Sequence, residues 1–443
     1  IEVLKLINRW IKRVGIGLFV CIGTVLVVIA ILMVMAARFN GIWKMDAHGL
    51  CLKADFGIVK AYAVTESSYT TLKNYDGVII NGTLYSGIGK FELNRSENTL
   101  ELIDHGARYV YSADKQSKDY FNHLHKVVQG DQDGKLHMFY EILKENYAFA
   151  DLYGVDFSQE YNKYAPLVTN ETTNETLFEY MCRMVEKLDD GHVELYWRDK
   201  AYTPSDYKPL WFTDHAQELV NLIKENYLND YHRFEDCYIR YGSLREDIGY
   251  IVFQAIGMPE LNKSATTKKA MEKIMKEFAD KRTIVIDMRF CNGGYDEAAL
   301  LIAGYFANKE YPAYAKQAYN NGIFTPLQRV SVYPNTLNCN GNVIIITSGY
   351  TISAGEIFIR SMLANPEHNV TVIGEATAGY YSDAIPMILP DGFEYSLSTE
   401  RYFWYDSTMI EGKGIEPNVE ISFDLQAVKL GKDKALDWIL QNQ

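Results

Sequence analysis

Cysteine is scarce in this sequence and is not arranged as a cross-linked or zinc-binding framework. The 443 residues include six cysteines, and no two of them form a CxxC motif. Cys21 lies in an apolar stretch near the N-terminus, and the other five are scattered: Cys51, Cys182, Cys237, Cys291 and Cys339. This spacing argues against a disulfide framework and a zinc site, so we expect no metal and no cofactor. Internal repeats are absent as well, which argues against a solenoid.

Positive charge is also in short supply. The formal net charge is −13, and because residues 1–38 carry +4, the remainder of the chain carries −17. An acidic body would be repelled by phosphate backbones, so we do not expect nucleic acid as a partner. Hydrophobic residues make up 48% of the chain, which is enough for a large core, and the length suggests about three domains.

Charged residues are missing from the stretch between Val14 and Ala37. As a helix this stretch would be about 36 Å long, enough to span a bilayer with some tilt. Four basic residues precede it, which predicts a cytoplasmic N-terminus and an extracytoplasmic body. A cleaved signal peptide is the alternative, but the apolar stretch is long for a signal core. We therefore expect residues 1–40 to form a basic stub and a single-pass anchor in the cell membrane.

Three regions follow the expected anchor. Residues 41–115 alternate apolar and polar residues between Gly, Asn and Asp turns, which predicts a small β-rich barrel or sandwich. Residues 116–200 have the three- and four-residue apolar spacing of helices, with a cap at Thr173. Residues 201–443 alternate apolar strands with helices, which is typical of an α/β sheet covered on both faces. In this region we expect strands at 248–255, 282–288, 342–348 and 370–374, and helices at 267–280, 295–307 and 354–364.

The strand expected at 342–348 leads into a helix through the sequence SGYTISAGE. Ser353 would stand at the start of that helix, beside the free N–H of Ala354 in the first turn. This position suits a nucleophile whose reaction develops an oxyanion. An ordinary Ser N-cap is the simpler interpretation of this stretch taken alone.

A second loop of small residues, FCNGG, ends the strand expected at 282–288. Gly293 and Gly294 would let backbone approach a substrate closely and could donate a second N–H to an oxyanion. If the two strands are parallel, both loops lie at the edge where α/β sheets bind ligands. The alternative is a strand–helix turn that merely requires positive φ.

A nucleophilic serine also needs a base. Of the nine histidines, His192 is distinguished by its setting, because Asp190 and Gly191 place it at a tight turn between a helix and the strand HVELYW. Three charged residues near the two loops are interpreted as buried structural ion pairs rather than as chemistry: Asp287, Arg289 and Glu356.

Five motifs, IDMRFCNGG, TISAGE, IGEATAG, DDGHVEL and GKGIEPNVEI, together resemble the tail-specific and tricorn-type serine peptidases. The resemblance covers roughly residues 130–425, and DGH is similar to the tricorn-core branch. It implies an α/β fold with a crotonase- or Clp-protease-like ββα core behind a helical subdomain. It also implies Ser353 as nucleophile, His192 as general base and Glu411 as the acidic relay residue. The oxyanion hole would be formed by the N–H of Ala354 with Gly293 or Gly294.

Two departures from the C-terminal processing branch bear on the mechanism. That branch uses a lysine base in a GExTxGK segment, and this chain has Tyr380 at the lysine position. This strengthens the assignment of His192. Lys413 could rival it as the base, but the GKG sequence is more simply interpreted as a turn. Only about 55 residues separate His192 from the strand IGYIVF, too few for a PDZ module and its connections.

The sequence therefore predicts a membrane-anchored serine peptidase that acts on peptides or unfolded proteins. A non-catalytic carrier of apolar ligands or peptides on the same fold is the main alternative, and an esterase is a third interpretation. The oligomeric state is left open.

Overall fold

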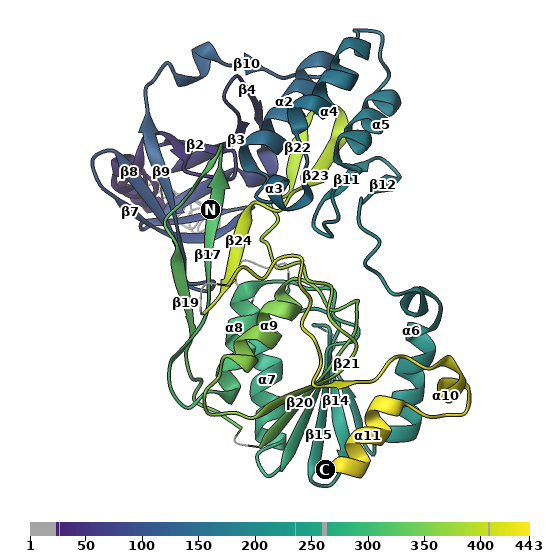
Figure 1. Ribbon diagram of the computed structural model, residues 1–443. Helices are drawn as coiled ribbons and strands as arrows, with labels where there is room; N and C mark the ends of the chain where they lie inside the picture. Colours follow the sequence, from purple (N-terminus) through teal and green to yellow (C-terminus); the bar gives the residue numbers. More distant parts are fainter. Residues whose placement is uncertain (1–23, 26, 235, 259–263, 340, 406–407) are drawn as a thin grey trace, which may run out of the picture.

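The computed structural model describes residues 24–25, 27–234, 236–258, 264–339, 341–405 and 408–443. These residues form an upper body of strands and helices and a lower α/β body, joined by long strands and by the chain that runs into α6 (Figure 1). The mixed α/β class expected from the sequence is confirmed.

The first part of the upper body is a closed barrel. Its strands follow the order β3-β2-β1-β9-β8-β7-β6-β5, and β5 pairs back onto β3. Alternating burial along β7 shows why this sequence pattern forms a barrel wall, since every second side chain faces the core. The strands are β1 (Gly41–Met45), β2 (Leu50–Asp55), β3 (Ile58–Val64), β4 (Ser68–Thr71), β5 (Gly77–Ile80), β6 (Thr83–Ser86), β7 (Gly89–Arg95), β8 (Thr99–Asp104), β9 (Tyr109–Gln116) and, beside β4, β10 (His125–Lys126).

The helical part of the upper body packs beside the barrel in one continuous core. Thr173 accepts a hydrogen bond from the N–H of Thr176 and caps the last of its helices, as the sequence predicts. The helices are α2 (Gln132–Asn146), α3 (Ala150–Tyr153), α4 (Phe157–Tyr164) and α5 (Asn174–Val185). A small sheet follows in the order β12-β11-β23-β22, with β11 (Glu194–Trp197), β12 (Lys200–Tyr202), β22 (Met387–Leu389) and β23 (Phe393–Ser396).

A seven-stranded sheet forms the centre of the lower body. Its order is β13-β14-β15-β16-β20-β21-β25, and the five strands from β15 to β25 are parallel. The strands are β13 (Tyr231–Arg233), β14 (Ile239–Arg245), β15 (Ile248–Phe253), β16 (Thr283–Asp287), β20 (Asn342–Thr347), β21 (Val370–Gly374) and β25 (Val419–Glu420). All four strands expected between residues 248 and 374 are thereby confirmed.

Helices cover both faces of this sheet, as expected (Figure 1). One face packs against α7 (Ala265–Glu277), α8 (Asp296–Ala303) and α9 (Ala354–Leu363). The other packs against α6 (Leu210–Leu222), α10 (Leu425–Lys429) and α11 (Lys434–Asn442). Burial on both sides explains why β15 and β16 are apolar throughout rather than alternating.

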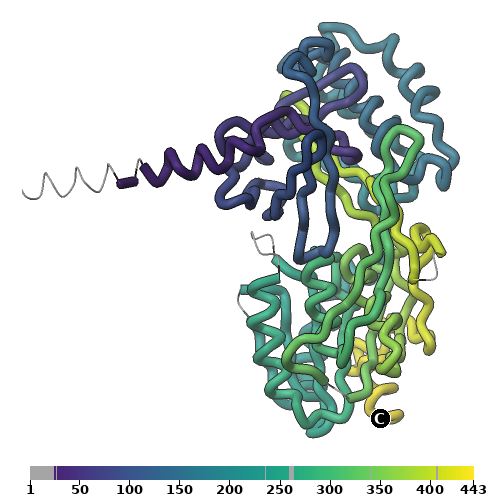
Figure 2. Tube along the Cα trace, turned by 90° about the vertical axis from the view of Figure 1, so that its left-hand side faces the viewer, coloured from purple at the N-terminus to yellow at the C-terminus, as the bar shows by residue number. Residues whose placement is uncertain are grey.

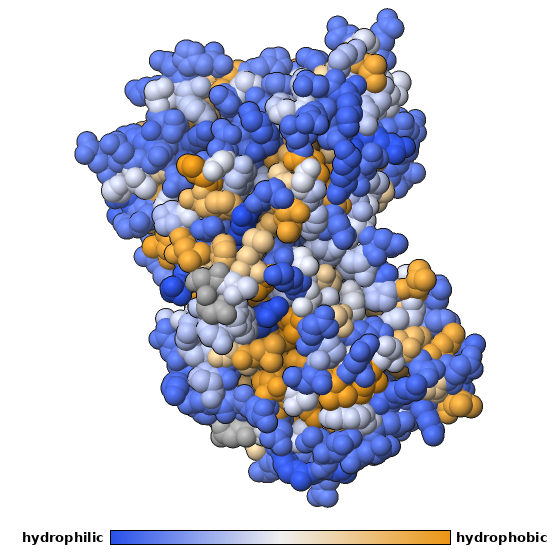
Figure 3. Space-filling model, in the orientation of Figure 1, coloured by the Kyte–Doolittle hydropathy of each residue, from blue (hydrophilic) through white to orange (hydrophobic). Residues whose placement is uncertain are grey.

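Strands from late in the chain connect the two bodies. β17 (Tyr311–Asn320) pairs with β18 (Ile323–Phe324), β19 (Gln328–Val332) and β24 (Glu400–Trp404). The segment before β24 pairs with β11 in the upper body, so that body is built from two separate parts of the chain. On the face drawn in Figure 3, apolar residues gather where the two bodies meet.

Residues 24–25 and 27–36 are helical and project away from the barrel (Figure 2). Within the described part of the chain, no helix has the length and apolarity needed to cross a membrane. Residues 14–23 and 26 of the expected anchor lie outside the described residues.

Candidate active site

The two glycine- and serine-containing loops lie side by side at one edge of the large sheet. They follow β16 and β20, which are adjacent parallel strands in register from Thr283↔Asn342 to Asp287↔Ile346. The Oγ of Ser348 donates to the carbonyl of Arg289 at 2.9 Å, and the Oγ1 of Thr351 donates to that of Met288 at 2.9 Å. The juxtaposition expected from the parallel strands is therefore present.

Ser353 has a strained backbone and does not cap its helix. Its φ of 60° and ψ of −130° are unusual for a residue with a side chain, and such conformations typically cost about 1–3 kcal/mol. Its carbonyl accepts the N–H groups of Glu356 at 2.8 Å and Ile357 at 3.0 Å, but its hydroxyl makes no capping bond. The ordinary N-cap interpretation is thus wrong, and the hydroxyl is left for another task.

Two glycines face Ser353 from the neighbouring loop. Gly293 has φ 95°, and a Cβ at that position would lie 2.7 Å from the Cβ of Ser353. Gly294 has φ 144°, and a Cβ there would lie 1.9 Å from the carbonyl oxygen of Ile256. Only glycine fits either position, because any side chain would collide with backbone or with the serine.

Backbone N–H groups of the two loops beside Ser353 are candidates for binding an oxyanion. The N–H of Asn292 donates to Gln254 and that of Tyr295 to Ile256, which leaves the N–H groups of Gly293 and Gly294 as candidates for a ligand. The N–H of Ala354 belongs to the first turn of α9, where backbone donors have no partner within the helix. The arrangement has the components of an oxyanion hole.

His192 lies in the turn between α5 and β11, in the setting expected from the sequence. Its N–H donates to the Oδ1 of Asp190 at 2.8 Å, and its carbonyl accepts from the Oγ of Ser396 at 2.8 Å. The ring Nδ1 is buried and has no hydrogen-bond partner among the described residues. Burial lowers the pKa of His192, although the Asp190 carboxylate opposes this shift, so the ring is held in its neutral, proton-accepting form.

Glu411 is buried close to His192. Its Oε2 accepts the N–H groups of Tyr381 at 2.9 Å and Ser382 at 3.2 Å, whereas its Oε1 has no partner among the described residues. Burial, and then the negative Asp190, raise the pKa of Glu411 well above its usual value. Polar atoms of Asp190, His192 and Glu411 all lie within 4.8 Å of one another.

Among the described residues, Asp190, His192 and Glu411 form the group whose polar atoms lie close enough together to be considered for a metal ion. Both carboxylate oxygens of Asp190 are already engaged, one by His192 N–H and the other by the hydroxyl of Tyr147 at 2.9 Å. One oxygen of Glu411 is engaged by two N–H groups, which leaves two free ligand atoms. Zinc sites use three or four protein ligands, so the group is better suited to a hydrogen-bonded relay.

A cavity of about 840 Å³ contains both Ser353 and His192 in its wall, together with Gly294. Glu411 is only 1% exposed and lies outside the described wall residues, behind His192 and Ser382, which are wall residues. The structure therefore brings together the predicted nucleophile, base and glycine loop, with the predicted acid behind the base.

Tyr380 does not take the place of a basic lysine. Its hydroxyl contacts the Oγ of Ser205 at 2.8 Å and the Oδ1 of Asp189 at 2.9 Å, and burial raises its pKa. Its carbonyl accepts the N–H of Ser353 at 2.9 Å, so the residue positions the serine through its backbone. Lys413 is exposed and lies in a turn with Gly412 at φ 74°, which favours the structural interpretation of the GKG sequence.

Two of the three charged residues that were predicted to form buried ion pairs do so. Arg289 forms a buried pair with Asp287 at 2.6 Å and a second with Asp433 at 2.8 Å, as expected for an ion pair. Glu356 has no ion-pair partner among the described residues, so that expectation is wrong. It instead accepts the N–H groups of Gly379 at 2.8 Å and Tyr380 at 2.9 Å, and burial raises its pKa to about 7.

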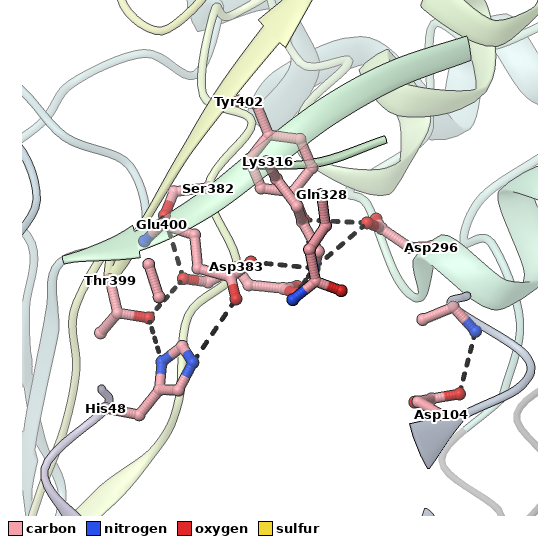
Figure 4. Close-up of polar contacts among 12 residues, drawn as sticks. His48, Asp104, Asp296, Lys316, Gln328, Ser382, Asp383, Thr399, Glu400 and Tyr402 are labelled. Atoms are coloured by element: carbon pink, nitrogen blue, oxygen red, sulfur yellow. Dashed lines mark hydrogen bonds and ion pairs between the residues drawn. The ribbon is translucent and has the colours of Figure 1, made fainter. Parts of the chain in front are cut away.

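Sequence reasoning missed a second buried group on the wall of the cavity, shown in Figure 4. We call it the charged cluster: Lys316, Asp296, Asp383, Glu400 and His48. The Nζ of Lys316 lies 2.6 Å from Asp383 Oδ2 and 2.8 Å from Glu400 Oε2, and His48 Nε2 lies 3.5 Å from Glu400 Oε1. These residues come from β17, β24, the start of α8, a loop and the barrel, and no local motif joins them. The hydrogen bonds of Asp190 were not predicted either, although Asp190 lies in the motif DDGHVEL.

Comparison with known proteins agrees with this geometry. Residues 247–421 match Peptidase family S41. The carboxy-terminal processing protease CtpB of Bacillus subtilis (strain 168) is 27% identical over 180 residues, which cover 39% of this chain. That match spans only 34% of the length of CtpB.

Solved structures show the same fold. The structure of a candidate peptidase from Parabacteroides merdae ATCC 43184 has a TM-score of 0.58 and 21% identity, covering 71% of this chain and 96% of its own. The structure of mature CPAF complexed with lactacystin has a TM-score of 0.51 and 9% identity, covering 70% of this chain and 97% of its own. At these identities the likeness establishes the fold alone. Residues 247–421 are thus similar to Peptidase family S41, a family of serine-type peptidases.

Proposed function

We propose that this protein is a serine peptidase that hydrolyses peptide bonds with Ser353 as nucleophile, His192 as general base and Glu411 as relay acid. One observation carries the proposal. The strained Ser353 and the ring of His192 share one cavity, while the buried, unpartnered Nδ1 of His192 and Oε1 of Glu411 belong to groups that meet within 4.8 Å. A small movement would join these two atoms by a hydrogen bond and fix the tautomer that a base requires.

The reaction would begin when the Oγ of Ser353 attacks the substrate carbonyl and His192 Nε2 takes its proton. The oxyanion would be held by the N–H of Ala354 and that of Gly293 or Gly294. His192 would then give the proton to the leaving amine, and water would release the acyl group by the same steps.

Glu411 would act mainly in the transition state. In the resting protein its carboxylate is buried beside Asp190 and has no ion-pair partner among the described residues, and burial, followed by the charge of Asp190, raises its pKa. When His192 becomes an imidazolium, it supplies the missing positive charge. The pair would therefore be stabilised more in the transition state than in the ground state, and such a difference lowers the barrier.

The direct test is Ser353→Ala, assayed with a mixture of unfolded protein substrates and with a fluorophosphonate probe. We expect hydrolysis and labelling to be lost, since removal of a triad nucleophile costs on the order of 10⁶-fold in rate. Ser361→Ala is the matched control, because Ser361 lies on the same helix and its hydroxyl is buried without a partner among the described residues. Full hydrolysis by Ser353→Ala would refute the proposal.

A non-catalytic carrier of apolar ligands is the second candidate, favoured by the many apolar residues in the cavity wall. The fluorophosphonate probe separates the two. A carrier has no need of an activated serine and would remain unlabelled, whereas a peptidase would be labelled at Ser353. Labelling accompanied by ester but not peptide hydrolysis would instead identify an esterase.

We also propose that residues 14–37 anchor the protein in the cell membrane, with the peptidase body on the extracytoplasmic side. In support, the described part of this segment is helical, projects from the barrel and exposes apolar side chains, such as Val25 at 56% and Val34 at 71%. After an alkaline carbonate wash, the chain should stay with the membranes and a version lacking residues 1–38 should not. Release of the full chain by the wash would contradict the anchor.

A further inference from the structure

The barrel supplies a large part of the cavity that contains Ser353. Six apolar residues of the barrel line it: Met45, Leu50, Ile88, Phe91, Leu102 and Tyr111. Across the cavity lie Ile385, Pro386 and Ile388, which belong to the segment that follows the serine-binding Tyr380. A volume of about 840 Å³ and a mostly apolar lining are typical of a site for a sizeable ligand group.

The polar groups of the same wall decide which part of a peptide fits there. Among the described wall residues, the acidic side chains are those of Asp383, Glu394 and Glu400, and no lysine or arginine joins them. Lys316, the nearest cation of the charged cluster, is fully buried behind Asp383 and Glu400. A free C-terminal carboxylate would meet negative charge here and no accessible cation, so the cavity disfavours it.

We propose that the barrel forms a specificity pocket that receives a large apolar side chain of the peptide, close to the bond cut at Ser353. This inference rests on the proposed peptidase function and extends it, because it names the substrate class: a peptide segment with a large apolar residue, recognised within the chain rather than by its C-terminal carboxylate. A domain outside the family-matched residues 247–421 thereby sets the preference of the catalytic domain.

Ile88 is the residue through which to test the pocket. It lies in the turn between β6 and β7, lines the cavity and is half-buried, so that a polar replacement should be tolerated by the barrel. Ile80 provides the matched control, since it is also an isoleucine of the barrel, is 42% exposed and lies outside the described cavity wall.

The experiment compares fluorescent decapeptides that differ only at one central position, which is Leu, Gly, Asp or Lys. Binding is measured by anisotropy in the Ser353→Ala background, and hydrolysis in the background with Ser353 intact. We expect Leu to be preferred over Gly and Asp by about tenfold or more, the scale on which apolar pockets discriminate. Ile88→Asp should remove that preference in both assays and Ile80→Asp should keep it.

The outcomes separate the pocket from the catalytic proposal. If hydrolysis and fluorophosphonate labelling fail but the Leu preference in binding depends on Ile88, the pocket stands and the peptidase function falls. If hydrolysis occurs and Ile88→Asp behaves as Ile80→Asp does, with unchanged melting temperature, the pocket is refuted. Loss of binding on amidation of the peptide C-terminus would also refute it, because the carboxylate would then be the recognised group.

Discussion

In the proposed peptidase the tasks would be divided: Tyr380 would help to position Ser353 through its backbone, and His192 with Glu411 would act as the base. The tyrosine hydroxyl is tied to Ser205 and Asp189, away from Ser353, and only its carbonyl touches the serine through the backbone. Proton transfer is left to a ring nitrogen whose pKa is lowered by burial. The candidate base His192 could be named from DGH and from the missing lysine. The hydrogen bonds of Asp190 could not be foreseen in full, because one of them comes from the hydroxyl of Tyr147, 43 residues earlier in the chain.

The pH dependence of activity tests this division of tasks at the scale of single residues. Both His192 and Glu411 must be without their ionisable proton for the relay to work. Burial lowers the pKa of His192 and raises that of Glu411, and we therefore expect the glutamate to be the last of the two to become active as pH rises. We expect Glu411→Gln to reduce kcat/KM on the order of 10²–10⁴-fold and to move the midpoint of the acidic limb to lower pH.

The lower midpoint in Glu411→Gln is expected because only the titration of His192 would remain. Glu356→Gln serves as the comparison, since Glu356 is also buried with a raised pKa but contacts the 377–380 loop rather than His192. A midpoint that stays in place or rises in Glu411→Gln, measured as kcat/KM between pH 5 and 9, would show that Glu411 does not control the relay.

At the scale of elements, the part of the site that could be predicted from the sequence is the part built on the parallel strands β16 and β20. Adjacent parallel strands end at the same sheet edge, so the FCNGG and TISAGE loops had to meet once the strands were recognised from their apolar runs. The upper wall of the cavity had no such local signal. It depends on β23 pairing with β11 and on β24 pairing with β17, contacts between residues far apart in the chain. Sequence periodicity shows that strands exist but does not show which distant strands they join.

The close approach of these two loops gives a prediction for Gly293. In Gly293→Ala the new methyl group would lie 2.7 Å from the Cβ of Ser353, so the serine or the loop must shift. We expect kcat to fall on the order of 10²–10³-fold, as when an oxyanion donor is displaced.

Gly154→Ala is the matched control, because Gly154 also has positive φ, 63°, but a Cβ there would meet nothing within 4 Å. Both variants should lose about 1–2 kcal/mol of stability from the left-handed backbone. Equal activity in the two would exclude the close approach as a requirement for catalysis.

At the scale of the whole molecule, the charged cluster joins the barrel to the catalytic body. His48 comes from the barrel and contacts Thr399 Oγ1 at 3.0 Å and Glu400 at 3.5 Å, while Lys316 lies on β17 between the two bodies. Burial raises the pKa of Glu400 to about 8 and lowers that of His48 to about 4. Lys316 is therefore the cation that balances several acids at the joint (Figure 4), and two of these acids, Asp383 and Glu400, also line the cavity.

Removal of that cation should loosen the joint in a pH-dependent way. Lys316→Met leaves Glu400 without its buried partner, and breaking a buried pair in this way typically costs about 3–5 kcal/mol. A carboxyl whose pKa is higher in the folded than in the unfolded chain takes up a proton on folding, so its stability contribution falls as pH rises between the two values. Without Lys316, the pKa of Glu400 would rise further above about 8, and that of Asp296 further above about 6, which makes this fall steeper.

The loss of melting temperature in Lys316→Met should therefore be larger at pH 8, on the order of 10 °C, than at pH 5, where the acids are already neutral. Lys309→Met is the matched control, because Lys309 forms an ion pair with Glu367 at 3.1 Å on the surface, where such pairs contribute little to stability. Its melting temperature should differ little from that of the unmodified protein at either pH. If the deficit of Lys316→Met were equal at pH 5 and pH 8, the lysine would act through its packing alone, and the barrel would be held to the catalytic body by apolar contacts rather than by charge.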